Sequence, residues 1–131
     1  MKQITILSRN LKNPVASLTQ RLATAGLDIE SITGEIYGGQ SVITLTLKDY
    51  ERALNLLSED PHLQVMAEDA LIVRIEDETG ALAKLSRRFA DTGIEIRSIR
   101  FVERHEGHAL VAISTERTQE ALALVRDILV S

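Results

Sequence analysis

The chain is 131 residues long, with 44% hydrophobic and 26% charged residues and a formal net charge of −4. This is enough apolar material for one compact domain or for two small ones that share a core, and too much for a disordered chain. The negative balance lacks the positive surplus that nucleic acids and anionic membranes attract. The absence of cysteine excludes disulfides, thiolate nucleophiles and cysteine metal sites.

No run of residues approaches the ~20 apolar residues of a membrane span. The first residues lead directly into a strand pattern, without a signal peptide. With 3% aromatic residues and no tryptophan, the chain also lacks base-stacking platforms. We therefore expect a cytoplasmic protein with neither nucleic-acid nor membrane partners.

The first predicted strand spans residues 3–8 and leads through a loop at 10–13 into a helix at 14–25. Asn13 is a favourable N-cap, and Pro14 suits the first helical position because its missing N–H is not needed there. We expect this helix to turn three apolar side chains inward: Val15, Leu18 and Leu22.

The strand that follows changes its apolar phase near Ser31. Apolar residues fall at 27 and 29 and then at 32 and 36. A slip of one residue in a period of two is what a β-bulge produces, and the second half of the chain slips in the same way near Ser98. We predict a bulge at both serines.

The rest of the first half continues with alternating elements. Gly38 and Gly39 predict a hairpin turn, and residues 42–47 form the next strand. A second helix must end before Pro61, and residues 62–67 form a fourth strand.

The second half begins with a strand at 71–75 and a turn at Thr79 and Gly80. Gly93 closes the next helix, because glycine adopts the left-handed conformation at little cost. The predicted inward face of this helix is Leu82, Leu85 and Phe89.

The two halves are copies of each other. Gly93 lies 67 residues after Gly26, and at this spacing eight of the 17 residues from 16 to 32 recur. The recurring residues are Ala16, Leu18, Arg21, Ala23, Gly26, Ile29, Ser31 and Ile32. After the hairpin the spacing becomes 68, which predicts one extra residue in the second hairpin.

Each half reads β-α-β-β-α-β, the ferredoxin-like unit, so the sequence predicts an α+β protein with antiparallel sheets. We place the first repeat at residues 1–69 and the second at 70–131. The second repeat ends in a helix predicted at 118–130, without a fourth strand. The edge of the strand at 71–76 then needs a cover: the strand at 62–67, the N-terminal strand or another subunit.

One motif occurs at the start of both repeats. It reads Asp77-x-x-Gly80-x-Leu82-Ala83 with Gly93-Ile94-x-Ile96, and Asn10 with Val15-Ala16 and Gly26-Leu27-x-Ile29. This tandem pattern resembles the ACT domain, a small regulatory module that commonly binds amino acids. The resemblance covers essentially the whole chain apart from the last strand. It implies a stand-alone ACT pair, for which we expect no attached catalytic or DNA-binding domain.

The start of each first helix suits an amino-acid ligand. Free N–H groups and the positive end of the helix dipole favour a carboxylate, and Gly80 lets a ligand approach the backbone. In the ACT family, a polar residue after strand one and another on strand two hold the ligand. The resemblance maps these residues to Asp77 with Glu95 and to Asn10 with Asp28. The full set of expected ligand-binding residues is Asn10, Asn13, Pro14, Val15, Asp28, Ile29, Asp77, Thr79, Gly80, Ala81, Leu82, Glu95 and Ile96.

Three of the four polar positions are acidic, and two carboxylates in one site repel an α-carboxylate. We therefore expect the first repeat to hold the more conventional pocket, and the second to bind a basic amino acid or nothing. A plainer interpretation stays open, in which Asn10 and Asp77 are turn residues and Asp28 and Glu95 face solvent. The chain would then be a ligand-free interaction subunit built from degenerate ACT domains.

Other chemistry has weaker support. His105 and His108 lack the helical spacing and the third ligand of a metal site. Arg97, Arg100 and Arg104 alternate with glutamates, which indicates charge pairs on a sheet, and no nucleophile or phosphate-loop motif is present. We expect a regulatory protein that acts through ligand-dependent association, as a homodimer and with a protein partner, and that has no catalytic activity, metal or cofactor.

Overall fold

The chain builds two main hydrophobic cores, each between an antiparallel sheet and two helices. The computed structural model describes residues 1–131, which divide into an N-terminal unit, Lys2–Glu68, and a C-terminal unit, Asp69–Ser131 with Met1. The first half contains β1 (Lys2–Arg9), α1 (Pro14–Thr24), β2 (Ile29–Tyr37), β3 (Gln40–Leu47), α2 (Tyr50–Ser58) and β4 (Leu63–Asp69). The second half contains β5 (Leu71–Glu76), α3 (Ala81–Asp91), β6 (Ile96–His105), β7 (His108–Thr115) and α4 (Thr118–Val125).

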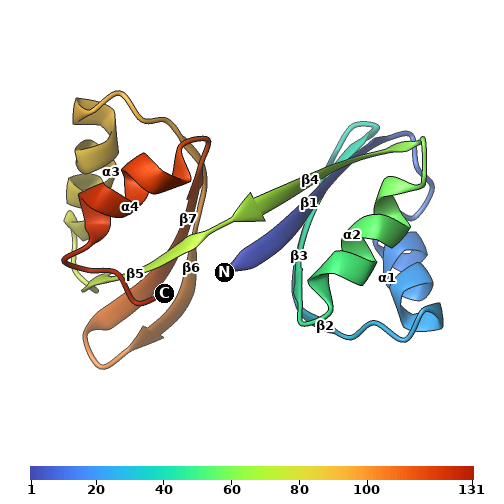
Figure 1. The fold of residues 1–131 in the computed structure, drawn as a ribbon, viewed down its shortest axis with the longest axis horizontal. Helices are drawn as coiled ribbons and strands as arrows, with labels where there is room; N and C mark the ends of the chain where they lie inside the picture. Colours follow the sequence, from blue (N-terminus) through green and yellow to red (C-terminus); the bar gives the residue numbers. More distant parts are fainter. The chain divides into compact units, whose positions relative to one another are not determined.

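The N-terminal unit has the strand order β2-β3-β1-β4, and both of its helices cover one face of the sheet (Figure 1). β1 pairs antiparallel with β3, so that Ile4 lies opposite Leu45. Alternate residues of a strand point to the same face, and this face meets Leu18 and Leu22 of α1. All four side chains are fully buried.

The C-terminal unit has the strand order β5-β7-β6, again with both helices on one face (Figure 1). Val73 of β5 lies opposite Val111 of β7, and both are buried against Leu85 and Phe89 of α3. The predicted α+β class with two ferredoxin-like units is confirmed, including a second sheet that lacks the fourth full strand.

Both predicted bulges are confirmed. The register of β2 on β3 shifts between Ile29 and Ser31, and that of β6 on β7 shifts between Ile96 and Ser98. At each bulge the serine hydroxyl bonds a hydroxyl on the neighbouring strand; Ser98 and Ser114 are 2.6 Å apart. The structure places the extra residue of the second hairpin within β6, as a further register shift between residues 101 and 103.

The start of α1 differs from the prediction in two respects. Asn13 stands at the N-cap position, but its backbone is left-handed and its side chain makes no capping hydrogen bond. Val15 was expected to face the core and is instead 39% exposed. Pro14 takes the inward position together with Leu18 and Leu22.

The last helix was predicted to run to residue 130 and ends at Val125. The residues that follow turn back along β5 as a short tail. The N–H of Arg74 donates to the carbonyl of Ile128 over 2.9 Å, and that of Ile72 donates to Ser131 over 2.9 Å. The edge of β5 is therefore covered in part by the chain's own residues 128–131, which was none of the three covers expected.

Each unit repeats one ion pair between its first helix and the segment after its second helix. Arg21 lies 2.8 Å from Asp60, and Arg88 lies 2.7 Å from Asp127. The N–H of His62 is the main cause that lowers the pKa of Asp60, and Arg21 lowers it further. The hydrogen bond from Arg88 is the main cause that lowers the pKa of Asp127.

Asp60→Asn tests the first of these pairs. Because the folded-state pKa of Asp60 lies below its ordinary value of 3.8, the charged form stabilises the unit above that value, and this stability is lost as the pH falls through the folded-state pKa. We expect the variant to have a lower urea midpoint near pH 7, and the difference to shrink as the pH falls below 3.8. Tyrosine fluorescence reports this unit alone, since both tyrosines, Tyr37 and Tyr50, lie in it. The control is Glu35→Gln, which removes an exposed carboxylate of β2; the same pH profile in both variants would contradict the assignment.

Gly93→Ala tests how α3 ends. The φ of Gly93 is +74°, and an added Cβ would meet no atom within 4 Å. The substitution should therefore cost only the left-handed backbone, about 1–2 kcal/mol of unfolding free energy. Gly93→Asn should cost less, because asparagine tolerates this conformation better. Urea unfolding followed by circular dichroism measures both, and an equal loss in the two variants would show that the cost has another source.

Candidate functional site

In both units the loop after the first strand is tied to the tip of the β-hairpin. The N–H of Asn10 donates to the carbonyl of Gly39 over 2.6 Å, and the N–H of Asp77 donates to that of Gly107 over 2.8 Å. Each bond lies within one repeat, and the two bonds involve equivalent residues. They hold the hairpin tip beside the loop that precedes the first helix, and a hollow lies at this place in each unit.

The N-terminal hollow has a volume of about 500 Å³ and an uncharged lining. The loop and the first turn of α1 form one wall, and the β2–β3 hairpin forms the other. Its lining residues are Asn10, Leu11, Asn13, Pro14, Val15, Ala16, Ile36, Gly38, Gly39, Gln40 and Ser41. This volume is within the range of small-molecule sites.

Backbone donors of α1 are available at this hollow. The first helical hydrogen bond runs from the N–H of Ser17 to the carbonyl of Asn13, and no side chain caps the helix. The N–H groups of Val15 and Ala16 therefore lack a helical partner. Uncapped donors at a helix start favour a carboxylate or another anion.

Two asparagines shape the loop. Asn10 has a φ of 54° and Asn13 a φ of 47°, and asparagine is one of the few residues with a side chain that enters this region readily. A Cβ on Gly39 would overlap the side-chain oxygen of Asn10. The glycine at the hairpin tip is therefore what makes room for the amide of Asn10.

The C-terminal hollow is smaller and acidic, with a volume of about 380 Å³. Glu76, Asp77 and Glu78 contribute carboxylates, and Arg104 from β6 contributes the one cation. The guanidinium of Arg104 lies 3.9 Å from the ring centre of Phe101. The other lining residues are Ile75, Thr79, Ala81, Leu82 and Phe101.

Arg104 already interacts with one of these carboxylates. Its Nε lies 3.7 Å from Oδ1 of Asp77, and both side chains are well exposed. An exposed ion pair of this kind contributes little to stability. It does reduce the negative charge at the mouth of the hollow, although the lining keeps a net negative charge.

The structure brings part of the expected set of ligand-binding residues together. Asn10, Asn13, Pro14 and Val15 line the N-terminal hollow, and Asp77, Thr79, Ala81 and Leu82 line the C-terminal one. Gly80 is the N-cap residue of α3, with a φ of 91° and open space where a Cβ would stand.

The remaining expected residues lie elsewhere within their own unit. Glu95 and Ile96 line a separate depression beyond the end of α3, and Asp28 and Ile29 follow the end of α1 in the same way. An 11-residue helix is about 16 Å long. Within one unit, Asp77 therefore does not line the same hollow as Glu95, and Asn10 does not lie beside Asp28.

Sequence reasoning missed the hairpin residues of both hollows. Ile36, Gln40 and Ser41 come from the first hairpin, and Phe101 and Arg104 come from the second. Arg104 was expected only to take part in charge pairs with glutamates on a sheet surface. A usable signal was the short loop between strand and helix, which must lie near the hairpin tip in a ferredoxin-like unit.

No three His, Asp or Glu side chains lie close enough together to hold a metal ion. His105 lies 3.6 Å from Glu106 at the hairpin tip, and His108 lies 3.7 Å from Glu76. None of the helices is both long enough and apolar enough to cross a membrane.

The sequence matches no protein-family model and no curated protein. Among solved structures, protein BT0572 from Bacteroides thetaiotaomicron is 18% identical with a TM-score of 0.74, covering 98% of this chain and 90% of that one. The regulatory subunit of aspartate kinase from Thermus thermophilus, in its ligand-free form, is 22% identical with a TM-score of 0.60, covering 96% and 91%. Aspartate kinase from Synechocystis is 19% identical with a TM-score of 0.57, covering 94% of this chain and 24% of that one. This likeness is one of fold, and together with the duplicated sequence motif it gives the chain the fold of a tandem ACT pair.

Proposed function

We propose that this chain is a regulatory protein of the ACT type that binds an amino acid in its N-terminal hollow. The observation that carries the proposal is an uncharged hollow of about 500 Å³ at the uncapped start of α1. It offers backbone donors to an anion without placing a carboxylate beside them. A neutral zwitterion fits these features better than a fully anionic or cationic ligand does.

The lining suggests how such a ligand would lie. Its α-carboxylate would accept from the N–H groups of Val15 and Ala16, at the positive end of the helix dipole. The amide oxygen of Asn10 would accept from its ammonium group, and its side chain would lie against Ile36.

The fold neighbours support a regulatory role, since one of them is a regulatory subunit of aspartate kinase. A ligand can act on a partner only if it binds one arrangement of the protein better than another. We propose that the bound amino acid changes how this chain associates with a partner protein. We further propose that the chain acts as a cytoplasmic homodimer without catalytic activity.

The acidic C-terminal hollow favours a second candidate function for its unit. Its carboxylates disfavour an α-carboxylate, and Asp77 already interacts with Arg104. This unit would then bind a cationic compound, or it would bind no small molecule and serve as an interaction module.

The N-terminal site is tested by melting the protein with each of the twenty amino acids at millimolar concentration. A ligand that binds only the native state adds about 2.7 kcal/mol of stability at a hundred times its Kd, so a neutral amino acid should raise Tm. Asn10→Gly keeps the left-handed backbone but removes the amide, and should weaken binding by about tenfold in calorimetry, the cost of one lost hydrogen bond to a charged group. Asp77→Asn, the equivalent position of the other unit, should leave the affinity unchanged. If the protein is folded and no amino acid raises its Tm, the amino-acid site is contradicted, and the chain is instead a ligand-free interaction subunit.

The C-terminal hollow is tested with lysine and arginine. If it is a cation site, either ligand should shift the amide resonances of Thr79 and Gly80, and Asp77→Asn should weaken binding several-fold, about the value of one charge contact. Added salt should weaken it further, because the contacts are exposed. A lack of shifts at millimolar ligand would assign this unit to the interaction role.

A further inference from the structure

The outer edge of β5 is only partly covered. The tail bonds the N–H groups of Ile72 and Arg74. Every second residue of an antiparallel strand faces the same edge, so the next groups on this edge are the carbonyl of Arg74 and the N–H of Glu76. The tail does not reach them, because it has already turned toward α4, where the N–H of Ile128 donates to the carbonyl of Val125.

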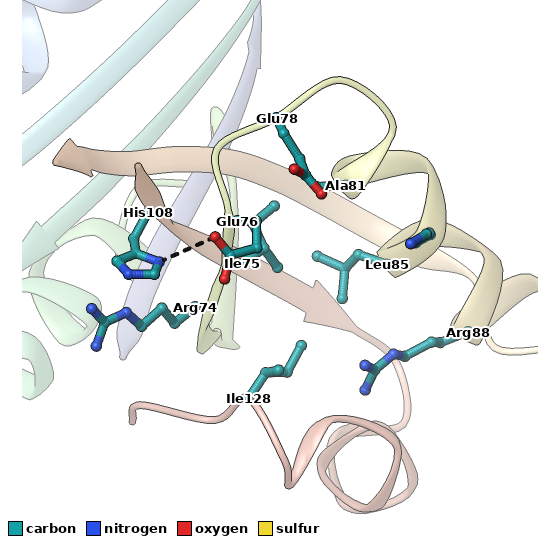
Figure 2. A pocket seen from close by; sticks show the side chains of 10 residues that line it. Arg74, Ile75, Glu76, Glu78, Ala81, Leu85, Arg88, His108 and Ile128 are labelled. Carbon is teal, nitrogen blue, oxygen red and sulfur yellow. Dashed lines mark ion pairs between the residues drawn. The ribbon is translucent and has the colours of Figure 1, made fainter. Parts of the chain in front are cut away.

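A cavity of about 320 Å³ lies at this open end of β5 (Figure 2). Its apolar floor consists of Ile75, Leu85 and Ile128. Figure 2 shows Leu85 approaching from α3 and Ile128 from the tail, on either side of the space beside Ile75. The cavity therefore has the size and floor to accept an aliphatic side chain.

The N-terminal unit has a strand of its own, β4, beside the corresponding edge. Ser8 corresponds to Ile75 at the repeat spacing of 67, and β4 lies beside β1 in the sheet. The side chain of Gln3, near the start of β1, donates to Glu68, near the end of β4, over 3.0 Å. The two strands therefore run in opposite directions, and the start of β4 lies beside the end of β1. Leu63, the first residue of β4, is 9% exposed and belongs to the core.

Some of the charged side chains around the cavity form ion pairs and others do not. His108 lies 3.7 Å from Glu76, and Asp127 holds Arg88. Lys84 of α3 lines the cavity without an ion pair of its own, whereas Glu78 stands on the loop before α3. An incoming acidic residue would be attracted at the Lys84 side and repelled at the Glu78 side.

We propose that the open end of β5 binds an extended segment of a partner polypeptide as an added edge strand. The segment places an aliphatic side chain on the floor of Ile75 and Leu85 and an acidic residue beside Lys84. Its backbone pairs with the carbonyl of Arg74 and the N–H of Glu76, as in β-augmentation. This surface is separate from the amino-acid site proposed in the N-terminal hollow, because the two share no lining residue. It does share Ile75, Glu76, Glu78 and Ala81 with the C-terminal hollow, whereas Lys84 and Leu85 line this cavity alone.

The probe is a capped synthetic peptide with the sequence of residues 60–67, Asp-Pro-His-Leu-Gln-Val-Met-Ala. It carries Leu63, the buried first residue of the strand that lies beside β1 in the N-terminal unit, together with Asp60. Titrated onto the full chain, saturating peptide should slow hydrogen exchange of the Glu76 amide by about tenfold or more, because that N–H gains a carbonyl partner.

Matched variants separate this mode of binding from others. Lys84→Glu should weaken peptide binding by about fivefold or more through charge reversal, whereas Lys48→Glu, the same change in the N-terminal unit, should leave it unchanged. A peptide with serine in place of the leucine should bind at least several-fold more weakly, about the loss of one buried aliphatic side chain.

The proposal is overturned by no binding at millimolar peptide, by binding that leaves the Glu76 amide unprotected, or by equal loss of affinity in the two lysine variants. Free leucine that shifts the amide resonances of the cavity residues without slowing exchange of the Glu76 amide would also overturn the proposal, in favour of a small-molecule pocket.

Discussion

Burial of one face of the first helix against its sheet fixes the geometry of each unit. Leu18 and Leu22 in α1, and Leu85 and Phe89 in α3, are at most 2% exposed. Full burial of such a side chain contributes about 1.5–3 kcal/mol, whereas exposed ion pairs contribute about 0–1 kcal/mol. Packing therefore sets the helix axis. With the axis fixed, the uncapped start of the helix must lie at the loop after the first strand, beside the hairpin tip.

The duplicated scaffold separates backbone geometry from side-chain chemistry. Asn10 and Asp77 make the same backbone hydrogen bond to a hairpin glycine, so the two loops are held alike. Their surroundings differ, because one hollow is uncharged and the other carries three carboxylates and Arg104. The charge of the lining residues then decides which ligand each repeat can accept. A single fold can thus present two different recognition surfaces within one short chain.

Local signals made most of the fold predictable. The bulges at Ser31 and Ser98 follow from a one-residue slip in the apolar pattern, and Gly93 ends its helix for a reason that involves only its own backbone. The site was less predictable because it depends on which loops meet in space. Glu95 follows Asp77 closely in the motif, yet a whole helix separates them. Arg104 reaches the hollow through the register of a hairpin that carries an extra residue in β6, and sequence spacing alone does not fix where in the hairpin the extra residue lies.

The end of α4 shows how a tertiary demand overrides helix propensity. Val125, Ile128 and Leu129 have the apolar spacing of a continuing helix, and propensity alone costs only tenths of a kcal/mol per residue. The exposed edge of β5 offers backbone hydrogen bonds and an apolar floor, so the chain leaves the helix and bonds Ile72 and Arg74 instead. An open strand edge is a hazard that proteins usually cover or charge. Here the tail covers the buried part of β5, and what stays open ends in charged residues, which limits pairing with an unrelated strand but still permits a complementary one.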